Sequence, residues 1–234
     1  MSQLIELKRG VVEVIVTSLM EVYPKEAVGL IFGSKTPSGY RCDVSIPLQE
    51  AERDVFGVSW RLLYQERVKK AIFYTFGYKF LGIYHSHTDA PATLSEEDIS
   101  LLRERNYPLC LVGEISKVGC KRPYWLEAKL GIQGNIQNFK VVINAFTINA
   151  NGIEQAKVKF PFMKVYNILA EKFGISFYNI INLPDNELQK VQYSFQKMDY
   201  HLGRGGNGYR QQKITYALKN IERILRENVG LLGL

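Results

Sequence analysis

Apolar residues recur along the first 150 residues in two spacings, one typical of strands and the other of helices. Compact apolar runs bounded by glycine or turn residues predict strands, and apolar residues at helical spacing with charges between them predict helices. The predicted strands span residues 3–8, 27–33, 40–48, 79–87, 107–115, 122–130 and 139–148. The predicted helices span residues 9–22, 60–76 and 95–105. Because the order shows no regular βαβ repeat, it favours an α+β fold, a mixed β-sheet flanked by helices.

The pattern becomes mainly helical towards the C-terminus. Three helices are predicted there, at residues 160–173, 185–198 and 209–228. The glycine-rich stretch GRGGNG at residues 203–208 is expected to break the chain between the last two. The chain is therefore predicted to have two parts, a domain over residues 1–150 and a C-terminal helical extension over residues 151–234.

Charge is distributed unevenly between these parts. The net charge of the chain is +7. Residues 1–150 hold 18 Lys and Arg against 16 Asp and Glu, a net charge of +2, and residues 151–234 hold 12 against 7, a net charge of +5. A basic surface can attract an acidic partner. We do not expect nucleic acid to be that partner, because the chain has no aromatic-basic RNA motif or recognisable DNA-reading motif.

Three further features indicate a cytoplasmic setting. No apolar run reaches the ~18–20 residues that a membrane span needs, so we expect no membrane association. The N-terminus, MSQLIELKRG, lacks the apolar stretch of a signal peptide. The three cysteines, Cys42, Cys110 and Cys120, include no C-x-x-C pair, which argues against disulfides and against a cysteine-rich zinc site.

Two of only three histidines in the chain stand one residue apart at the end of a predicted strand. On a strand, His85 and His87 point to the same face. Ser95 and Asp98 follow at the spacing of a helix N-cap and its N3 acid. A loop returning over the strand end would bring Asp98 beside both imidazoles, a ligand set that suits Zn²⁺ with a fourth position open. The alternative is two structural histidines beside an ordinary helix cap.

The pattern H-x-H-x(7)-S-x-x-D, formed by His85, His87, Ser95 and Asp98, resembles the signature of the JAMM (MPN+) zinc metalloprotease family. The family also has an upstream glutamate. Glu26, within the sequence YPKEAVGLIFG, matches that position. Four fixed positions and a separate glutamate motif rarely coincide by chance, so the resemblance favours the metal site over the structural alternative.

Two further segments resemble the proteasome-lid deubiquitinase branch of the family, and we interpret the chain as a prokaryotic homologue. DVFGVS at residues 54–59 resembles the loop that grips the C-terminal tail of the modifier. KVVINAFTI at residues 140–148 resembles the strand that closes the domain. The resemblance covers residues 4–150 and implies a cytidine-deaminase-like MPN/JAMM fold.

The resemblance also implies a role for each matched residue. His85, His87 and Asp98 would hold one Zn²⁺ per chain. Glu26 would act as general base and then general acid for the hydrolytic water. Ser95 would stabilise the oxyanion of the tetrahedral intermediate. The implied activity is a zinc-dependent isopeptidase that cuts after the C-terminal Gly-Gly of ubiquitin or a ubiquitin-like modifier.

The resemblance implies partners as well. The modifier tail would add as a strand to a short segment by β-augmentation. That segment consists of Asp54, Val55, Phe56, Gly57 and Val58. The C-terminal helices would join a proteasome-like or other protein complex. Two alternatives stay open: a protease that trims ubiquitin-fold sulfur-carrier precursors, and a JAMM-fold scaffold subunit with little turnover.

Overall fold

The computed structural model describes residues 3–119, 124–149, 152–163, 165–167, 169, 175, 180, 183–202 and 208–228. The chain divides into two compact units. The first contains Met1–Lys121 and Trp125–Pro161, and the second contains Arg122–Tyr124 and Phe162–Leu234. All of the predicted site residues belong to the first unit.

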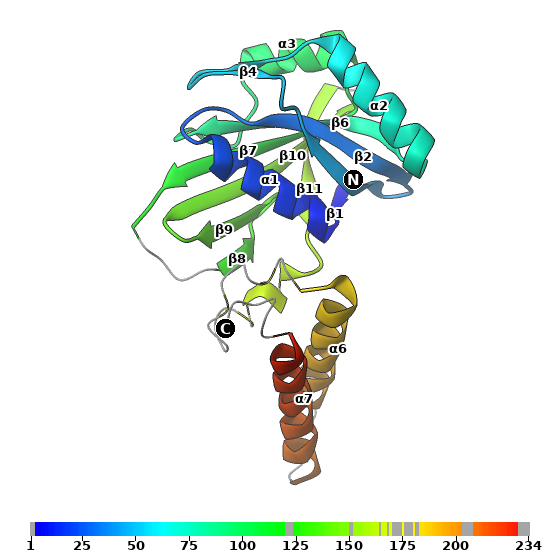
Figure 1. Cartoon of the computed structure of the whole chain (residues 1–234), viewed down its shortest axis with the longest axis vertical. Helices are drawn as coiled ribbons and strands as arrows, with labels where there is room; N and C mark the ends of the chain where they lie inside the picture. The colour runs from blue at the N-terminus through cyan, green and yellow to red at the C-terminus, as the bar shows by residue number, and fades with distance from the viewer. Residues whose placement is uncertain are drawn as a thin grey trace. The chain divides into compact units, whose positions relative to one another are not determined.

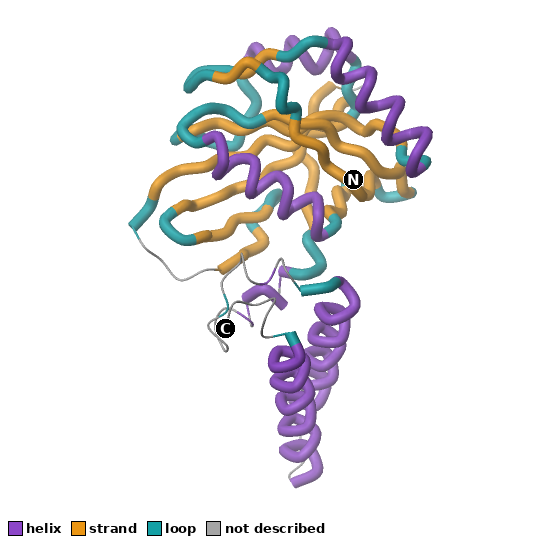
Figure 2. Tube along the Cα trace, in the orientation of Figure 1, coloured by secondary structure: helices purple, strands orange, loops and turns teal. Residues whose placement is uncertain are grey.

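A nine-stranded mixed sheet forms the centre of the first unit (Figure 1, Figure 2). Its order is β11-β1-β3-β2-β6-β7-β10-β9-β8, and β11 also pairs with β10, so the sheet curls until these two strands meet. Strand β6 pairs antiparallel with β2 and parallel with β7. The strands are β1 (Leu4–Leu7), β2 (Val28–Thr36), β3 (Gly39–Pro47), β6 (Lys79–Thr88), β7 (Leu109–Lys117), β8 (Tyr124–Glu127), β9 (Ile132–Ile136), β10 (Phe139–Asn149) and β11 (Gly152–Lys159).

Three helices and a small hairpin complete this unit. The helices are α1 (Arg9–Val22), α2 (Leu62–Phe76) and α3 (Glu96–Arg105). The hairpin is a separate two-stranded sheet of β4 (Glu52–Arg53) and β5 (Val58–Ser59). The predicted mixed sheet flanked by helices is thereby confirmed.

The two faces of the sheet are covered by different helices. On one face, the Tyr84 hydroxyl of β6 donates to Ser18 Oγ of α1 at 3.1 Å. On the other face, Ile83 of β6 shares a buried apolar cluster with Ile72 of α2 and Leu102 of α3. Because side chains alternate along a strand, the residues on either side of Tyr84 face α2 and α3.

Helix α1 forms although its sequence, RGVVEVIVTSLMEV, is rich in β-branched residues that disfavour helices. Its buried apolar residues recur at helical spacing: Val11, Val12, Ile15, Val16 and Leu19. This spacing places them on one stripe against the sheet. Burial of the stripe outweighs the weak helix propensity of its valines.

The predicted strands and helices of the first 150 residues are present within a few residues of their expected ends, and three features were missed. The β4–β5 hairpin is too short for a periodic signal. A glycine interrupts β9, whose sequence is IQGNI. Strand β11, GIEQAKVK, continues the sheet beyond residue 150, where the extension was expected to begin. Its alternation of polar and apolar residues is short and therefore a weak signal beside the helical pattern that follows.

The second unit contains a pair of helices, α6 (Asp185–Leu202) and α7 (Gly208–Glu227), which lie side by side (Figure 1). Asn220 Nδ2 of α7 donates to Ser194 Oγ of α6 at 3.2 Å. Both predicted helices are therefore confirmed. Of the third, predicted at residues 160–173, the described positions 163, 165–167 and 169 are helical, whereas 160–162 are not. Residues 203–207 of the glycine-rich stretch lie outside the described residues, as does Cys120.

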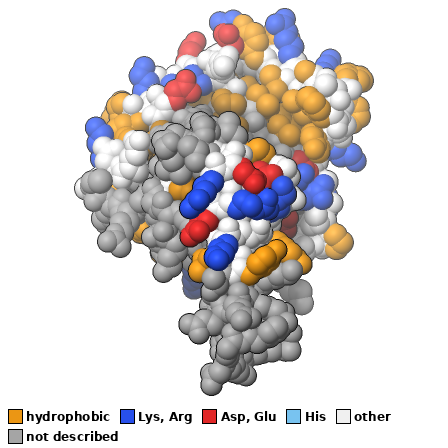
Figure 3. All heavy atoms as spheres, turned by 60° about the horizontal axis from the view of Figure 1, so that its bottom comes forward, with side chains coloured by type: hydrophobic (Ala, Val, Ile, Leu, Met, Phe, Trp, Pro, Cys, Tyr) orange, Lys and Arg blue, Asp and Glu red, His pale blue; other side chains and the backbone are white. Residues whose placement is uncertain are grey.

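Charged side chains on the second unit pair with one another. Arg223 Nη1 lies 3.0 Å from Glu227 Oε1 on α7, and Lys190 Nζ lies 2.6 Å from Glu187 Oε1 on α6. In the view of Figure 3, Lys and Arg side chains are interspersed with Asp and Glu. None of the described helices combines the length and apolar character needed to cross a membrane.

The pairing of β11 predicts where the chain can be shortened. A chain ending at residue 161 keeps all nine strands, whereas one ending at residue 150 loses β11 and its buried Ala156 and Val158. We expect the shorter chain to lose about 3 kcal/mol or more of its free energy of unfolding relative to the longer one. Urea unfolding followed by circular dichroism measures this. Equal stability of the two chains would contradict the structural role of β11.

Candidate metal centre

Strand β6 carries both histidines at its C-terminal end. His85 and His87 face α3, and Ser86 between them bonds to the segment before β2. The Ala27 N–H donates to Ser86 Oγ at 2.8 Å, and the Ser86 N–H donates to the Ala27 carbonyl at 3.0 Å. These two bonds hold the chain next to Glu26 against the strand that carries the histidines. Ser86 was not predicted as part of the site, although it stands between the two histidines of the H-S-H motif.

Asp98 reaches the histidines from the first turn of α3. Ser95 is the N-cap of this helix, and the two residues form a capping box. The Asp98 N–H donates to Ser95 Oγ at 3.1 Å, and the Ser95 N–H and hydroxyl each donate to Asp98 Oδ2 at 2.8 Å. The cap therefore engages Oδ2 and fixes the orientation of the carboxylate, while Oδ1 lies 3.1 Å from His85 Nε2.

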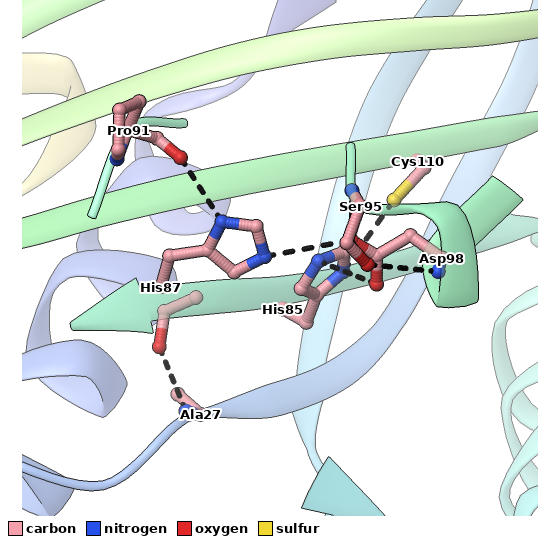
Figure 4. Close-up of polar contacts among 8 residues, drawn as sticks. Ala27, His85, His87, Pro91, Ser95, Asp98 and Cys110 are labelled. Atoms are coloured by element: carbon pink, nitrogen blue, oxygen red, sulfur yellow. Dashed lines mark hydrogen bonds and ion pairs between the residues drawn. The ribbon is translucent and has the colours of Figure 1, made fainter. Parts of the chain in front are cut away.

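The predicted His-His-Asp group is present. One ligand atom from each of His85, His87 and Asp98 lies within 4.8 Å of the others (Figure 4). His87 Nε2 lies 3.4 Å from Asp98 Oδ2. A helix cap and a strand end, about ten residues apart in sequence, meet here because the loop at residues 89–94 returns over the sheet.

The tautomers of the two rings suit metal binding. His87 Nδ1 lies 3.0 Å from the Pro91 carbonyl oxygen. A carbonyl can only accept, so Nδ1 carries a proton, and Nε2, which faces Asp98, is the ring nitrogen that would bind a metal ion. His85 Nε2 is buried and has no hydrogen-bond partner among the described residues, although Asp98 Oδ1 is close. A buried nitrogen left in this state fits a ligand of a metal ion.

The loop that supplies Pro91 is itself anchored. Asn144 of β10 donates from Nδ2 to the Ala92 carbonyl at 2.8 Å, and the Tyr23 hydroxyl donates to Asp89 Oδ2 at 2.9 Å. The amide oxygen of Asn144 occupies the space that a side chain at Gly131 would need. Asn144 was not predicted from the sequence, because it lies far from the His-His-Asp motif along the chain.

The electrostatics of the site favour a charged Asp98. Burial alone would raise the pKa of its carboxyl, but the His85 and His87 imidazoles beside it hold that pKa well below its usual range. The hydrogen bond to Asp98, with smaller contributions from the Pro91 carbonyl and nearby acids, raises the pKa of His87. Asp98 is therefore a carboxylate at neutral pH, the form that a metal ion requires.

Glu26 lies just before β2, and its side chain is buried. Burial raises the pKa of its carboxyl, and the nearby His87 and His85 only partly offset this. Its N–H donates to the Asp54 carbonyl at 3.0 Å, which ties Glu26 to the β4–β5 hairpin. The turn of that hairpin closes through Asp54, whose Oδ1 accepts from the Phe56 N–H at 2.7 Å.

A cleft of about 460 Å³ brings the predicted residues together. Its lining consists of Glu26, Phe56, Gly57, Val58, Trp60, Ile83, His85, His87, Ser95, Glu97, Asp98 and Leu101. All five residues predicted for catalysis and metal binding line it. Of the predicted substrate segment, Phe56, Gly57 and Val58 do so, whereas Asp54 and Val55 do not. Phe56 is 96% exposed.

Comparison with known proteins places this chain in a family. The family of prokaryotic homologues of the JAB domain matches residues 8–126, which include the whole cleft. This chain belongs to that family. The JAMM resemblance of the sequence is thereby confirmed at the level of the family. No curated protein matches the chain.

A solved structure resembles this JAB-domain homologue in part. It is the solution structure of protein DSY2949 from Desulfitobacterium hafniense. The two share 22% sequence identity with a TM-score of 0.48, over 67% of this chain and 92% of the other.

The geometry predicts which substitutions remove the metal. Asp98→Ala and His87→Ala should each abolish stoichiometric zinc binding, because each removes a ligand atom. Asp98→Ala also breaks the capping box, so Ser95→Ala is the matched control. Ser95→Ala should lose about 1 kcal/mol of stability through the lost cap yet keep zinc. Metal analysis and thermal unfolding of the three variants measure both effects, and one zinc per chain in His87→Ala or Asp98→Ala would contradict the ligand set.

Proposed function

We propose that this JAB-domain homologue is a zinc-dependent isopeptidase that hydrolyses the bond after the C-terminal Gly-Gly of ubiquitin or a ubiquitin-like modifier. One observation carries the proposal. The His-His-Asp group, Glu26 and Ser95 line a single cleft whose wall includes part of a two-stranded hairpin. A metal site without a nearby base, or a base without a cleft surface on which the substrate can bind, would support the activity far less.

The donor set fits zinc. Two imidazoles and one carboxylate form a three-ligand site with an open position, which is typical of catalytic rather than structural zinc. His85, His87 and Asp98 would hold the ion, which when bound supplies Lewis acidity and an activated water at neutral pH.

Glu26 is the proposed general base and then general acid. Glu26 lines the cleft with the ligand group, and burial raises the pKa of its carboxyl, which makes it a better proton acceptor. In the forward direction Glu26 takes a proton from the attacking water. It then delivers that proton to the departing lysine amine.

Ser95 is the proposed donor to the oxyanion. Its hydroxyl has a single proton, which points to Asp98 Oδ2 in this structure. Donation to the carbonyl oxygen of the substrate therefore requires the hydroxyl to turn towards the cleft. The backbone N–H of Asp98 continues to hold Ser95 Oγ during that rotation.

The β4–β5 hairpin is the proposed dock for the modifier tail. As a two-stranded sheet it leaves one edge of each strand unpaired by the described residues. An extended Gly-Gly tail can add to such an edge through main-chain hydrogen bonds. Val58 of β5 lines the cleft, so a tail paired there would lead to the metal group.

The wider setting is also part of the proposal. Cys42 and Cys110 are buried free thiols, in keeping with a reducing cytoplasm. Helices α6 and α7 are the proposed contact with a protein complex, and the exposed Tyr193 and Tyr216 on them support this.

Cleavage of a ubiquitin-fold protein joined through Gly-Gly to a lysine side chain tests the proposal. The wild type should cleave the isopeptide in the presence of zinc and stop when a chelator removes it. A matched substrate with a linear peptide bond distinguishes isopeptidase action from trimming of a precursor. If zinc-loaded protein cleaves neither the isopeptide nor the linear substrate, the proposed activity is overturned.

Glu26→Gln is the sharpest variant in that assay. Loss of the base should lower kcat by at least about 100-fold, while zinc binding persists because Glu26 is outside the ligand group. Glu96→Gln removes an exposed carboxylate from the first turn of α3 and serves as the control. Turnover near the wild-type rate in Glu26→Gln would exclude Glu26 as the base.

Phe56→Ala tests the hairpin. Because Phe56 is almost fully exposed, its removal should leave stability and zinc binding unchanged. If the modifier packs on this ring, KM should rise by about 10-fold, as for a binding hot spot. Tyr216→Ala removes another exposed aromatic from α7 and should leave KM unchanged. An unchanged KM in Phe56→Ala would separate the hairpin from substrate binding.

A further inference from the structure

Cys110 lies behind His85 in the sheet. Strands β6 and β7 are parallel, with Ile83 opposite Cys110 and His85 opposite Val112. Because alternate residues share a face, Cys110 and His85 are on the same face of the sheet. The Cys110 sulfur lies 3.6 Å from His85 Nδ1 (Figure 4).

The surroundings leave this nitrogen few other partners. Cys110 belongs to a buried apolar cluster that also contains Ile83, Val112 and Phe146. Its own exposure is 0%, and that of His85 is 4%. Among the described residues, the sulfur is the only hydrogen-bond partner of the His85 ring. A buried Nδ1 without it would carry the cost of an unsatisfied polar group.

The sulfur is not placed to be a metal ligand. The ligand atoms that cluster within 4.8 Å of one another come from His85, His87 and Asp98, and Cys110 is not among them. Nδ1 and Nε2 lie on different edges of the imidazole. With Nε2 close to Asp98, the edge that faces Cys110 points away from the ligand group.

We propose that Cys110 is a positioning residue for the metal centre, with its thiol sulfur accepting the Nδ1–H of His85. This contact holds the ring in the tautomer that leaves the Nε2 lone pair for a metal ion bound between His85 and Asp98. The inference rests on the metal site of the proposed function. The Nδ1 atoms of the two histidines then have different hydrogen-bond acceptors, the Pro91 carbonyl oxygen for His87 and the Cys110 sulfur for His85.

The chemistry of sulfur shapes the expected effect. A partner to the second nitrogen of a ligating histidine typically contributes about 10–100-fold to metal affinity. Sulfur is a weak acceptor, which places the expected effect near about 10-fold. In place of Cys110, serine is smaller but its hydroxyl oxygen can also accept the hydrogen bond. Valine fills a volume similar to that of cysteine but has no hydrogen-bond acceptor.

Zinc affinity of the full chain tests the proposal, with Cys110→Val and Cys110→Ser compared with Cys42→Val and Cys42→Ser. Cys42 is the matched control, since it is also a fully buried free thiol on the same sheet. Chelator competition should give a Kd for zinc about 10-fold higher in Cys110→Val and within about 3-fold of wild type in Cys110→Ser. The Cys42 variants should leave the Kd unchanged. Thermal unfolding of the metal-free proteins reports any loss of stability separately.

A second measurement uses the wild-type protein, so its result does not depend on whether a variant folds. Long-range ¹H–¹⁵N spectra of the zinc-loaded wild type should show a proton on His85 Nδ1. An unprotonated Nδ1 would overturn the proposal, as would a wild-type Kd in Cys110→Val. A sulfur-to-metal charge-transfer band in the cobalt-substituted protein would do the same, because it would make Cys110 a ligand.

The results of these experiments distinguish the positioning role of Cys110 from the proposed isopeptidase activity. Absence of zinc binding by the wild type overturns both. If Cys110→Val weakens zinc binding as expected but no substrate is cleaved, the positioning role stands and the isopeptidase proposal fails. If cleavage occurs and Cys110→Val binds zinc as tightly as wild type, only the positioning role fails.

Discussion

The double pairing of β6 is the constraint on which the candidate site depends. This strand is bonded to β2 on one side and to β7 on the other, so its backbone cannot rotate. Two residues at positions i and i+2 of this strand must then point to the same face of the sheet. For this reason the side chains of His85 and His87 keep a constant orientation relative to each other. Each neighbouring strand adds one more residue to the site. The segment leading into β2 carries Glu26, and β7 carries Cys110.

The second component of the site is a helix cap used for two purposes. In a capping box, an acid at N3 normally stabilises the first turn of a helix. Here Asp98 does so through Oδ2, while Oδ1 lies beside His85. The hydrogen bonds of the cap hold the carboxylate in one orientation. A ligand held in this way needs little ordering when a metal binds, which favours tight binding.

Membership of the family agrees with this geometry but does not determine the activity, because function depends on the site rather than on the fold. The ligand group, a buried acid with a raised pKa and an open hairpin edge occur together in one cleft. Each of these could occur alone in a structural protein. Their combination is the basis of the proposed hydrolysis.

The amino-acid sequence by itself determined the features that depend on neighbouring residues. Strand alternation placed His85 and His87 on one face, and the i, i+3 spacing of Ser95 and Asp98 determined the cap, because both follow from local backbone geometry. The tertiary structure alone decided which distant segments meet. The pairing of β11 with β1 and β10 and the contact of Cys110 with His85 both depend on strand register. Register is set by packing across the whole sheet, which no local pattern contains.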